Sequence, residues 1–291
     1  MILIVLLIIF QPDIPLVIFL NENAIWIIIL FIAVGILYML FNQNRLVYFS
    51  MFSAGILTFF LQDISNKNLV FNKNIAKKNS LHILHIDIFN TEDTKEKILE
   101  NIVRKNADIL MFEELTPDWN KFLIEKLKMD YFNIITLNSL DFDSKLIMSK
   151  YNFISRDTFT LAGHPQLDVT VFYNNTPLKL LYTYVVPYTM VGENINNKYQ
   201  IDDLAEYIGK SKVSAMIVAG EFNQVYWTKR IRNFLYETKL NNARRFISFK
   251  KRNPYDHIFY SNRLKCVYLD EIYDSKSNHI GIEGYFRPEF D

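Results

Sequence analysis

The sequence predicts a mixed α/β domain that follows an apolar, membrane-spanning region. Residues 1–62 carry only three charged side chains, Asp13, Glu22 and Arg45, and all the others lie beyond them. Residues 81–291 alternate short apolar runs, typical of buried strands, with segments whose apolar residues recur at helical spacing. With 291 residues, 50% of them hydrophobic, the chain can form one large packed domain in addition to the apolar region.

Charge and cysteine content exclude some classes of protein. The formal net charge of +1 argues against a strongly basic surface that coats nucleic acid, although a local patch can still bind phosphate. The single cysteine, Cys266, excludes an intramolecular disulfide framework and a cysteine-based zinc cluster.

Two segments of the apolar region are long enough to cross a bilayer. Residues 24–41 and 46–62 hold 18 and 17 residues without a charge, which suits a hydrocarbon core roughly 30 Å thick at about 1.5 Å per helical residue. Residues 1–20 are also apolar, but Gln11, Pro12 and Asp13 interrupt them, so they predict at most a kinked third span. A cleaved signal peptide is the alternative, but the chain start lacks a basic region and the apolar stretch is too long.

We therefore expect a multi-pass membrane protein whose N-terminal helices bind the lipid bilayer. Residues 63–80 are expected to be a linker, polar and lysine-rich from Asn66 to Ser80, and residues 81–291 the folded domain. The side on which the domain lies stays open, because Arg45 and the lysines of the linker make competing positive-inside predictions. The lysines, which favour the cytoplasmic side slightly by number, are Lys67, Lys73, Lys77 and Lys78.

The apolar runs predict seven strands and three helices after the linker. The expected strands are 81–89, 107–112, 145–149, 167–173, 178–186, 214–219 and 258–260. A capping box of Asp93 and Glu96 is expected to begin a helix that ends near Lys105, and further helices are expected at 199–208 and 228–237.

Four segments place acidic, amide or histidine residues near the ends of these strands. They are HIDIFN at 85–90, ADILMFEELTPDW at 107–119, IVAGEFNQVYW at 217–227, and the pair YDHIFYS at 255–261 with SNHIGIEGYF at 277–286. In this order they resemble the motifs of the endonuclease/exonuclease/phosphatase superfamily, the deoxyribonuclease I-like proteins. The membrane-anchored arrangement also resembles a bacterial branch of that family. The resemblance implies a four-layer α/β/β/α sandwich with an active site at the strand ends.

The resemblance also implies a cofactor and its ligands. The chemistry requires one or two hard divalent cations, Mg²⁺ or Mn²⁺, held by oxygen ligands against a phosphate. Glu114 matches the family's metal-binding glutamate. Asp87 stands where the family usually has an asparagine, and Asn278 replaces an aspartate that contributes to metal binding in relatives.

The catalytic residues that the resemblance implies lie on the later motifs. His279 matches the terminal catalytic histidine, and Asp256 matches the carboxylate that orients it. Asn223 matches the asparagine that orients the nucleophile, while Glu221 replaces the neighbouring aspartate and carries its carboxylate one methylene further. Tyr184 stands where many members have a histidine, and its hydroxyl can donate the same hydrogen bond to the phosphate or the leaving group.

Several other residues receive weaker interpretations. Glu113 adds a negative charge beside Glu114, where the family usually has glutamine. Trp119 and Trp227 are expected to be packing anchors, and a basic segment before Asp256 either rims a phosphate site or is a solvated loop. That segment contains Arg244, Arg245, Lys250, Lys251 and Arg252, and the histidines expected to be structural are His82, His85, His164 and His257.

Two functional hypotheses follow. The first is a membrane-anchored, metal-dependent phosphoesterase, a hydrolase or nuclease whose substrate is nucleic acid or a phospholipid head group. The second is a catalytically impaired homologue that acts as a membrane-tethered binding or scaffolding module. Departures from the family pattern at Asp87, Glu113, Tyr184, Glu221 and Asn278 favour the second. The sequence leaves protein partners and the oligomeric state open.

Overall fold

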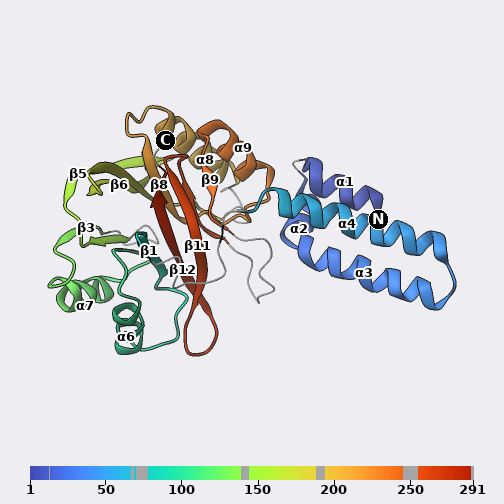
Figure 1. The fold of residues 1–291 in the computed structure, drawn as a ribbon, viewed down its shortest axis with the longest axis horizontal. Helices are drawn as coiled ribbons and strands as arrows, with labels where there is room; N and C mark the ends of the chain where they lie inside the picture. The colour runs from blue at the N-terminus through green and yellow to red at the C-terminus, as the bar shows by residue number, and fades with distance from the viewer. Residues whose placement is uncertain are drawn as a thin grey trace.

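The chain folds into an apolar helical region beside a two-sheet α/β domain (Figure 1). The computed structural model describes residues 1–12, 14–66, 69, 78–138, 144–187, 194–244 and 255–289. Most of the expected linker and of the basic segment lie outside the described residues. The individual residues named above that lie outside them are Asp13, Lys67, Lys73, Lys77, Arg245, Lys250, Lys251 and Arg252.

The apolar region forms four helices, which extend to the right of the domain in Figure 1. They are α1 (Ile2–Phe10), α2 (Pro15–Glu22), α3 (Ala24–Leu40) and α4 (Asn44–Asp63). Among the described residues, α4 alone is long and apolar enough to span a membrane as one helix. A second span results if α3 and residues 16–22, bent by 78° at Asn23, count as one.

The possible third span within residues 1–20 does not form as one helix. The break at Gln11 and Pro12 separates α1, of 9 residues, from α2, of 8 residues. At about 1.5 Å per residue, neither crosses a hydrocarbon core roughly 30 Å thick. Gln11 takes a left-handed conformation, φ 48°, which ends α1.

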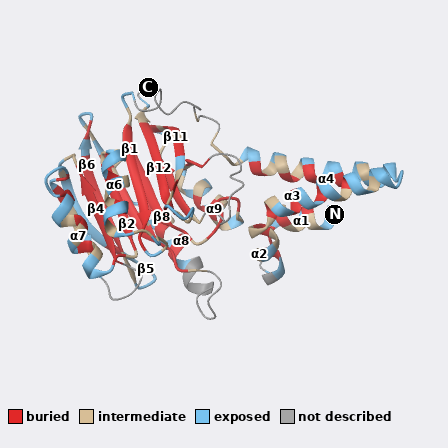
Figure 2. Cartoon of the chain, turned by 90° about the horizontal axis from the view of Figure 1, so that it is seen from below, coloured by how far each residue is buried: buried red, intermediate tan, exposed pale blue. Residues whose placement is uncertain are grey.

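The helices α3 and α4 pack against each other and expose apolar side chains outward. The Ser50 hydroxyl donates to the Phe31 carbonyl at 2.5 Å in the seam between them. Trp26, Leu40 and Phe59 point away from this seam and are each at least 64% exposed. Figure 2 shows this alternation of buried and exposed faces along both helices.

The domain consists of two six-stranded sheets that pack face to face. The first has the order β11-β12-β1-β2-β4-β3 and the second the order β5-β6-β7-β8-β10-β9. Their strands are β1 (Leu81–Asp87), β2 (Ile109–Glu113), β3 (Asn133–Leu137), β4 (Lys145–Ser149), β11 (Leu264–Tyr273) and β12 (His279–Pro288) in the first, and β5 (Phe153–Leu161), β6 (His164–Tyr173), β7 (Thr176–Tyr184), β8 (Ala215–Glu221), β9 (Asn241–Asn242) and β10 (Asp256–Tyr260) in the second.

Three apolar layers hold the sheets and helices together. Between the sheets, Ile83 and Met111 of the first pack in one cluster with Leu180 and Ile217 of the second. The helices α6 (Lys95–Lys105) and α7 (Pro117–Leu127) cover the outer face of the first sheet, and α8 (Asn194–Gly209) and α9 (Lys229–Thr238) cover that of the second. This arrangement confirms the predicted four-layer sandwich.

All seven expected strands and all three expected helices form; the strand expected at 145–149 has the expected ends, and the other elements have shifted ends. The capping box predicted at Asp93 is wrong, because Thr94 is the N-cap of α6 and its side chain accepts from the Lys97 amide. The Asp93 carboxylate instead accepts from the backbone amide and hydroxyl of Ser275. Helix α7 and strands β3, β5, β9, β11 and β12 were not expected from the sequence.

Glycine is required at position 220, one residue before the end of β8. Gly220 has φ +138°, and a Cβ atom there would lie 1.8 Å from the Thr183 carbonyl oxygen. We expect Gly220→Ala to destabilise the full-length chain by at least about 2 kcal/mol, measured by thermal unfolding in detergent. Gly209→Ala is the matched control, since a Cβ there meets nothing within 4 Å. Equal melting temperatures of the two variants would contradict this account of β8.

Candidate active site

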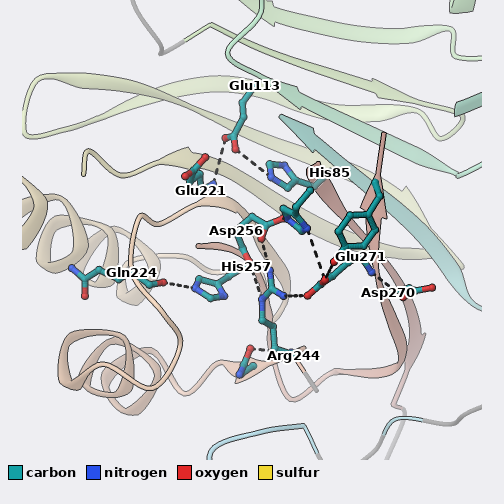
Figure 3. Close-up of polar contacts among 12 residues, drawn as sticks. His85, Glu113, Glu221, Gln224, Arg244, Asp256, His257, Asp270 and Glu271 are labelled. Atoms are coloured by element: carbon teal, nitrogen blue, oxygen red, sulfur yellow. Dashed lines mark hydrogen bonds and ion pairs between the residues drawn. The ribbon is translucent and has the colours of Figure 1, made fainter. Parts of the chain in front are cut away.

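The ends of five strands meet at one edge of the sandwich and carry most of the predicted site. Asp87 ends β1 and pairs in register with Glu113, which ends β2. Glu221 ends β8, where it is in register with Tyr184 on one side and Asp256 on the other. The Glu221 amide donates to a Glu113 carboxylate oxygen at 3.4 Å, which joins the two sheets at this edge (Figure 3).

Four carboxylates concentrate negative charge at this edge. Glu114 follows β2 in a left-handed conformation, φ 55°, and its carboxyl is hydrogen-bonded to Asp87. Burial first, and then the charges of Asp87, Glu113 and Glu221, raises the pKa of Glu114 to about 9. A positive-φ glutamate is uncommon, and such conformations cluster at functional sites.

The carboxylate pair of Glu114 and Asp87 fits a hard divalent cation. Its donors are oxygens, and Mg²⁺ is usually held by one or two carboxylates while water and substrate phosphate complete its coordination. Across the described ranges, no three His, Cys, Asp or Glu side chains already converge as a metal site.

His279 and Asp256 form the predicted dyad. The His279 Nε2 atom lies 2.9 Å from a carboxylate oxygen of Asp256, and the His279 Nδ1 atom lies 4.0 Å from Glu271. Burial opposes ionisation of Asp256, but the charges of His279 and Arg244 outweigh it and hold the pKa of Asp256 well below its usual range. Asp256 thus stays ionised and can orient the imidazole through this contact.

Arg244 supports this dyad from within the protein. Arg244 is 3% exposed, and its guanidinium forms ion pairs with Asp256 and with Glu271, the latter at 3.2 Å (Figure 3). The solvated-loop interpretation is therefore wrong for Arg244, because two carboxylates from β10 and β11 surround it. A planar guanidinium suits this bridging of two carboxylates.

Asn223 and Tyr184 lie together next to the carboxylates. Asn223 has a left-handed backbone, φ 51°, and its amide nitrogen donates to the Val185 carbonyl at 2.9 Å. Its side chain also hydrogen-bonds the Tyr184 phenol. Burial, followed by the charges of Glu114 and Glu221, raises the pKa of Tyr184, so the phenol stays protonated and able to donate.

Asn278 belongs to a different polar network. Its amide nitrogen donates to Asp274 at 2.9 Å and to Glu92 at 3.1 Å, within and beside the turn between β11 and β12. The structure thus places the Asn278 amide with this turn rather than with Asp87 and Glu114. Its predicted metal role stays a prediction.

Two fully buried residues of the site, His85 and Lys145, were not predicted from the sequence. His85 has no exposed surface and lies with its Nε2 atom 3.2 Å from Glu113 and its Nδ1 atom 3.1 Å from the Tyr182 hydroxyl. Burial opposes its charge, but Glu113, Asp256 and Asp87 raise the pKa of His85 to about 9. Lys145, also fully buried, lies over the Tyr184 ring at 5.9 Å.

His85 could have been suspected from its motif, since it lies in HIDIFN two residues before Asp87. Lys145 heads a predicted strand, and a lysine inside an apolar strand is a signal of a buried partner. Glu271 of β11 lies in no motif. Trp227, which is 1% exposed, is a packing residue as expected.

The fold and this edge define a class of protein, namely a two-sheet α/β sandwich with a carboxylate-rich site and a histidine–aspartate dyad. The chain belongs to the Endonuclease/Exonuclease/phosphatase family, whose model matches residues 79–279. Every predicted site residue lies within that match. The coarser prediction of a hydrolase acting on phosphoester bonds agrees with this family, whose members are generally dependent on a divalent metal.

Solved structures similar to this chain share its fold. The catalytic domain of human Nocturnin with bound sulfate has a TM-score of 0.59 and 16% identity, covering 72% of this chain and 95% of that one. D. rerio TDP2 complexed with a single-strand DNA product has a TM-score of 0.57 and 14% identity, covering 72% and 100%. An endonuclease/exonuclease/phosphatase from Beutenbergia cavernae has a TM-score of 0.57 and 13% identity, covering 72% of each. No curated protein matches the chain significantly.

His257, beside the dyad, makes the stability of the chain depend on pH. Burial, followed by the charge of Arg244, lowers the pKa of His257 to about 3, while an unfolded histidine titrates at roughly 6.5. The unfolded state therefore binds the extra proton first, and stability is lost as pH falls below about 6.5, by up to about 1.4 kcal/mol per pH unit. Thermal unfolding between pH 7 and pH 5 should show a smaller loss in His257→Phe than in the wild type.

The variant keeps an aromatic ring among Phe222, Phe259 and Tyr226, although it loses the hydrogen bond of 2.7 Å to the Gln224 carbonyl. A lower melting temperature at pH 7 is thus compatible with the account. His164→Phe, at a half-buried histidine elsewhere in the domain, is the control for replacing a histidine by phenylalanine. If the melting temperature of His257→Phe falls between pH 7 and pH 5 as steeply as that of the wild type, the assigned role of His257 is contradicted.

Proposed function

We propose that this chain is a membrane-anchored, divalent-metal-dependent phosphoesterase that hydrolyses a phosphodiester or phosphomonoester of nucleic acid or of a lipid head group. The observation that carries the proposal is the juxtaposition of the Glu114–Asp87 carboxylate pair with the His279–Asp256 dyad at one edge of a sandwich of this family. The charge of His85 interacts with members of both groups, Asp87 and Asp256, which supports their closeness.

Glu114 and Asp87 would hold Mg²⁺ or Mn²⁺ in this site. When bound, the cation supplies the positive charge that neutralises the phosphate and stabilises the displacement. The chain's own groups do the rest. His279, held by Asp256, transfers a proton to or from the reacting oxygen, and Tyr184 donates a hydrogen bond to the phosphate or the leaving group.

Glu221 and Asn223 would orient and activate the attacking water. Glu221 is 6% exposed and lies in register between Tyr184 and Asp256, so its position at the centre of the edge supports this role. Its carboxylate is one methylene further from the backbone than that of the family's aspartate, while the Glu221 backbone is paired in register with Asp256.

The membrane anchor of this proposal is the α3–α4 pair. Its support is the span-length helix α4 and the apolar side chains that α3 and α4 expose outward. We propose that the chain is a multi-pass membrane protein. Detergent should therefore be needed to release it from membranes. Release of the full-length chain by alkaline carbonate alone would contradict the anchor. Protease protection in oriented vesicles would decide on which side of the membrane the domain lies, and we favour the cytoplasmic side.

The metal test uses Glu114 and a matched surface glutamate. In full-length protein in detergent, Glu114→Gln should weaken Mg²⁺ or Mn²⁺ binding at least 10-fold in calorimetry and abolish hydrolysis of a generic phosphodiester. Glu125→Gln, on the exposed surface of α7, should change neither. Absence of metal binding by the wild-type chain would favour the scaffolding hypothesis over the enzyme.

The dyad test separates proton transfer from metal binding. His279→Ala should lower kcat by about 10² to 10⁴-fold while metal affinity changes little, because the imidazole transfers a proton and is not one of the proposed metal ligands, Glu114 and Asp87. His164→Ala serves as the control histidine. Turnover by His279→Ala at the wild-type rate would remove the dyad from the mechanism.

A further inference from the structure

The N-terminal helices are joined to the domain by buried polar contacts as well as by the linker. The Gln11 side chain, 7% exposed, lies at the end of α1. Its amide nitrogen lies 2.8 Å from the Asn21 side-chain oxygen and 3.0 Å from the Trp227 carbonyl, and its oxygen accepts from the Lys229 amide. One glutamine thus bridges α1, α2 and the start of α9.

A second set of contacts surrounds this glutamine. The Trp227 indole nitrogen donates to the Asn21 carbonyl at 2.8 Å, and the Arg232 guanidinium donates to the Ile9 carbonyl at 3.1 Å. Ile8 and Leu57 of the apolar helices share one buried cluster with Val225, Trp227 and Phe234 of the domain. The joint thus combines hydrogen bonds across it with a shared apolar cluster.

The same joint reaches both halves of the candidate active site. Residues 222–228, which we call the Asn223 loop, run from Glu221 through Asn223 to the Gln11 contacts at Trp227. At the same end of α2, next to Asn21, Glu22 is hydrogen-bonded to the Tyr255 side chain, and Tyr255 directly precedes Asp256. The Phe222 amide donates to the Tyr255 carbonyl at 2.8 Å and connects the two segments.

Catalysis is sensitive to displacements of about 1 Å in the groups that orient a nucleophile. Asn223 holds a left-handed backbone, which persists only where its surroundings fix it. Removing one hydrogen-bonding side chain from this joint leaves its buried partners without a hydrogen bond. The Asn223 loop would then change its conformation rather than lose a single contact. The apolar helices are thereby placed to control the geometry of the site.

We propose that Gln11 is a positioning residue for the Asn223 loop, so that the N-terminal helices and the phosphoesterase domain form one catalytic unit. This inference rests on the proposed function for its kinetic readout only. The N-terminal helices are then more than a tether, because their docking sets the position of Asn223 and of the segment that carries Asp256.

The test compares Gln11→Met with Gln62→Met in the full-length protein in detergent. Methionine keeps the length of glutamine but cannot form the hydrogen bonds, and Gln62 lies on an exposed turn of α4. We expect kcat to fall at least 10-fold in Gln11→Met, with KM and metal affinity changed less than 3-fold. Amide hydrogen exchange should speed up in residues 222–228 and stay unchanged in β1 and β2, while Gln62→Met behaves as the wild type.

A second variant protects the test against misfolding of the first. Trp227→Phe removes the indole donor to Asn21 together with part of the buried ring, and it should also speed up exchange in residues 222–228 and lower kcat. Trp119→Phe, which makes the same change at a half-buried tryptophan, is its control. Wild-type kcat and wild-type exchange of residues 222–228 in both joint variants would overturn the inference. If the wild-type chain shows no turnover, the proposed function fails, and the exchange of the Asn223 loop still decides whether Gln11 positions it.

Discussion

The structure depends on the concentration of negative charge where the two sheets end together. Asp87, Glu113, Glu114 and Glu221 lie at one edge, and burial together with the charges of the other three raises the pKa of Glu114. The protein balances them with buried cationic side chains, His85 against Glu113 and Lys145 beside Tyr184, and with Arg244 against Asp256 and Glu271. The remaining charge at Glu114 and Asp87 is what a bound cation would neutralise.

The residues at this edge could be predicted from sequence motifs, because the end of each strand is marked locally by an apolar run followed by polar residues. Glu113 and Glu114 are adjacent in the chain, yet successive side chains at a strand end point to different sides. Glu113 therefore faces His85 and the Glu221 amide between the sheets, while Glu114 meets Asp87. Arg244 and Glu271 could not be paired from the sequence, because their contact depends on how β10 and β11 are placed.

The parts of the fold that were missed have weak local signals. Strand β12 contains Gly281 and Gly284, and β11 contains charged residues among its apolar ones, so neither strand forms an apolar run in the sequence. Gln11 and Asn21 look like interruptions of an apolar stretch in the sequence, whereas both are buried in the structure. Only the three-dimensional arrangement supplies their partners, Trp227 and Lys229.

The exchange of an aspartate for Asn278 has a physical explanation that does not require loss of function. The Asn278 amide donates to two carboxylates, Glu92 and Asp274. An aspartate at this position could not donate to either, and would add a third negative charge to the turn between β11 and β12. Asp87, where the family usually has an asparagine, restores a carboxylate at the end of β1 beside Glu114. The two departures thus move charge toward the Glu114 side of the edge, which is where a cation would bind, and argue for a rearranged site rather than a decayed one.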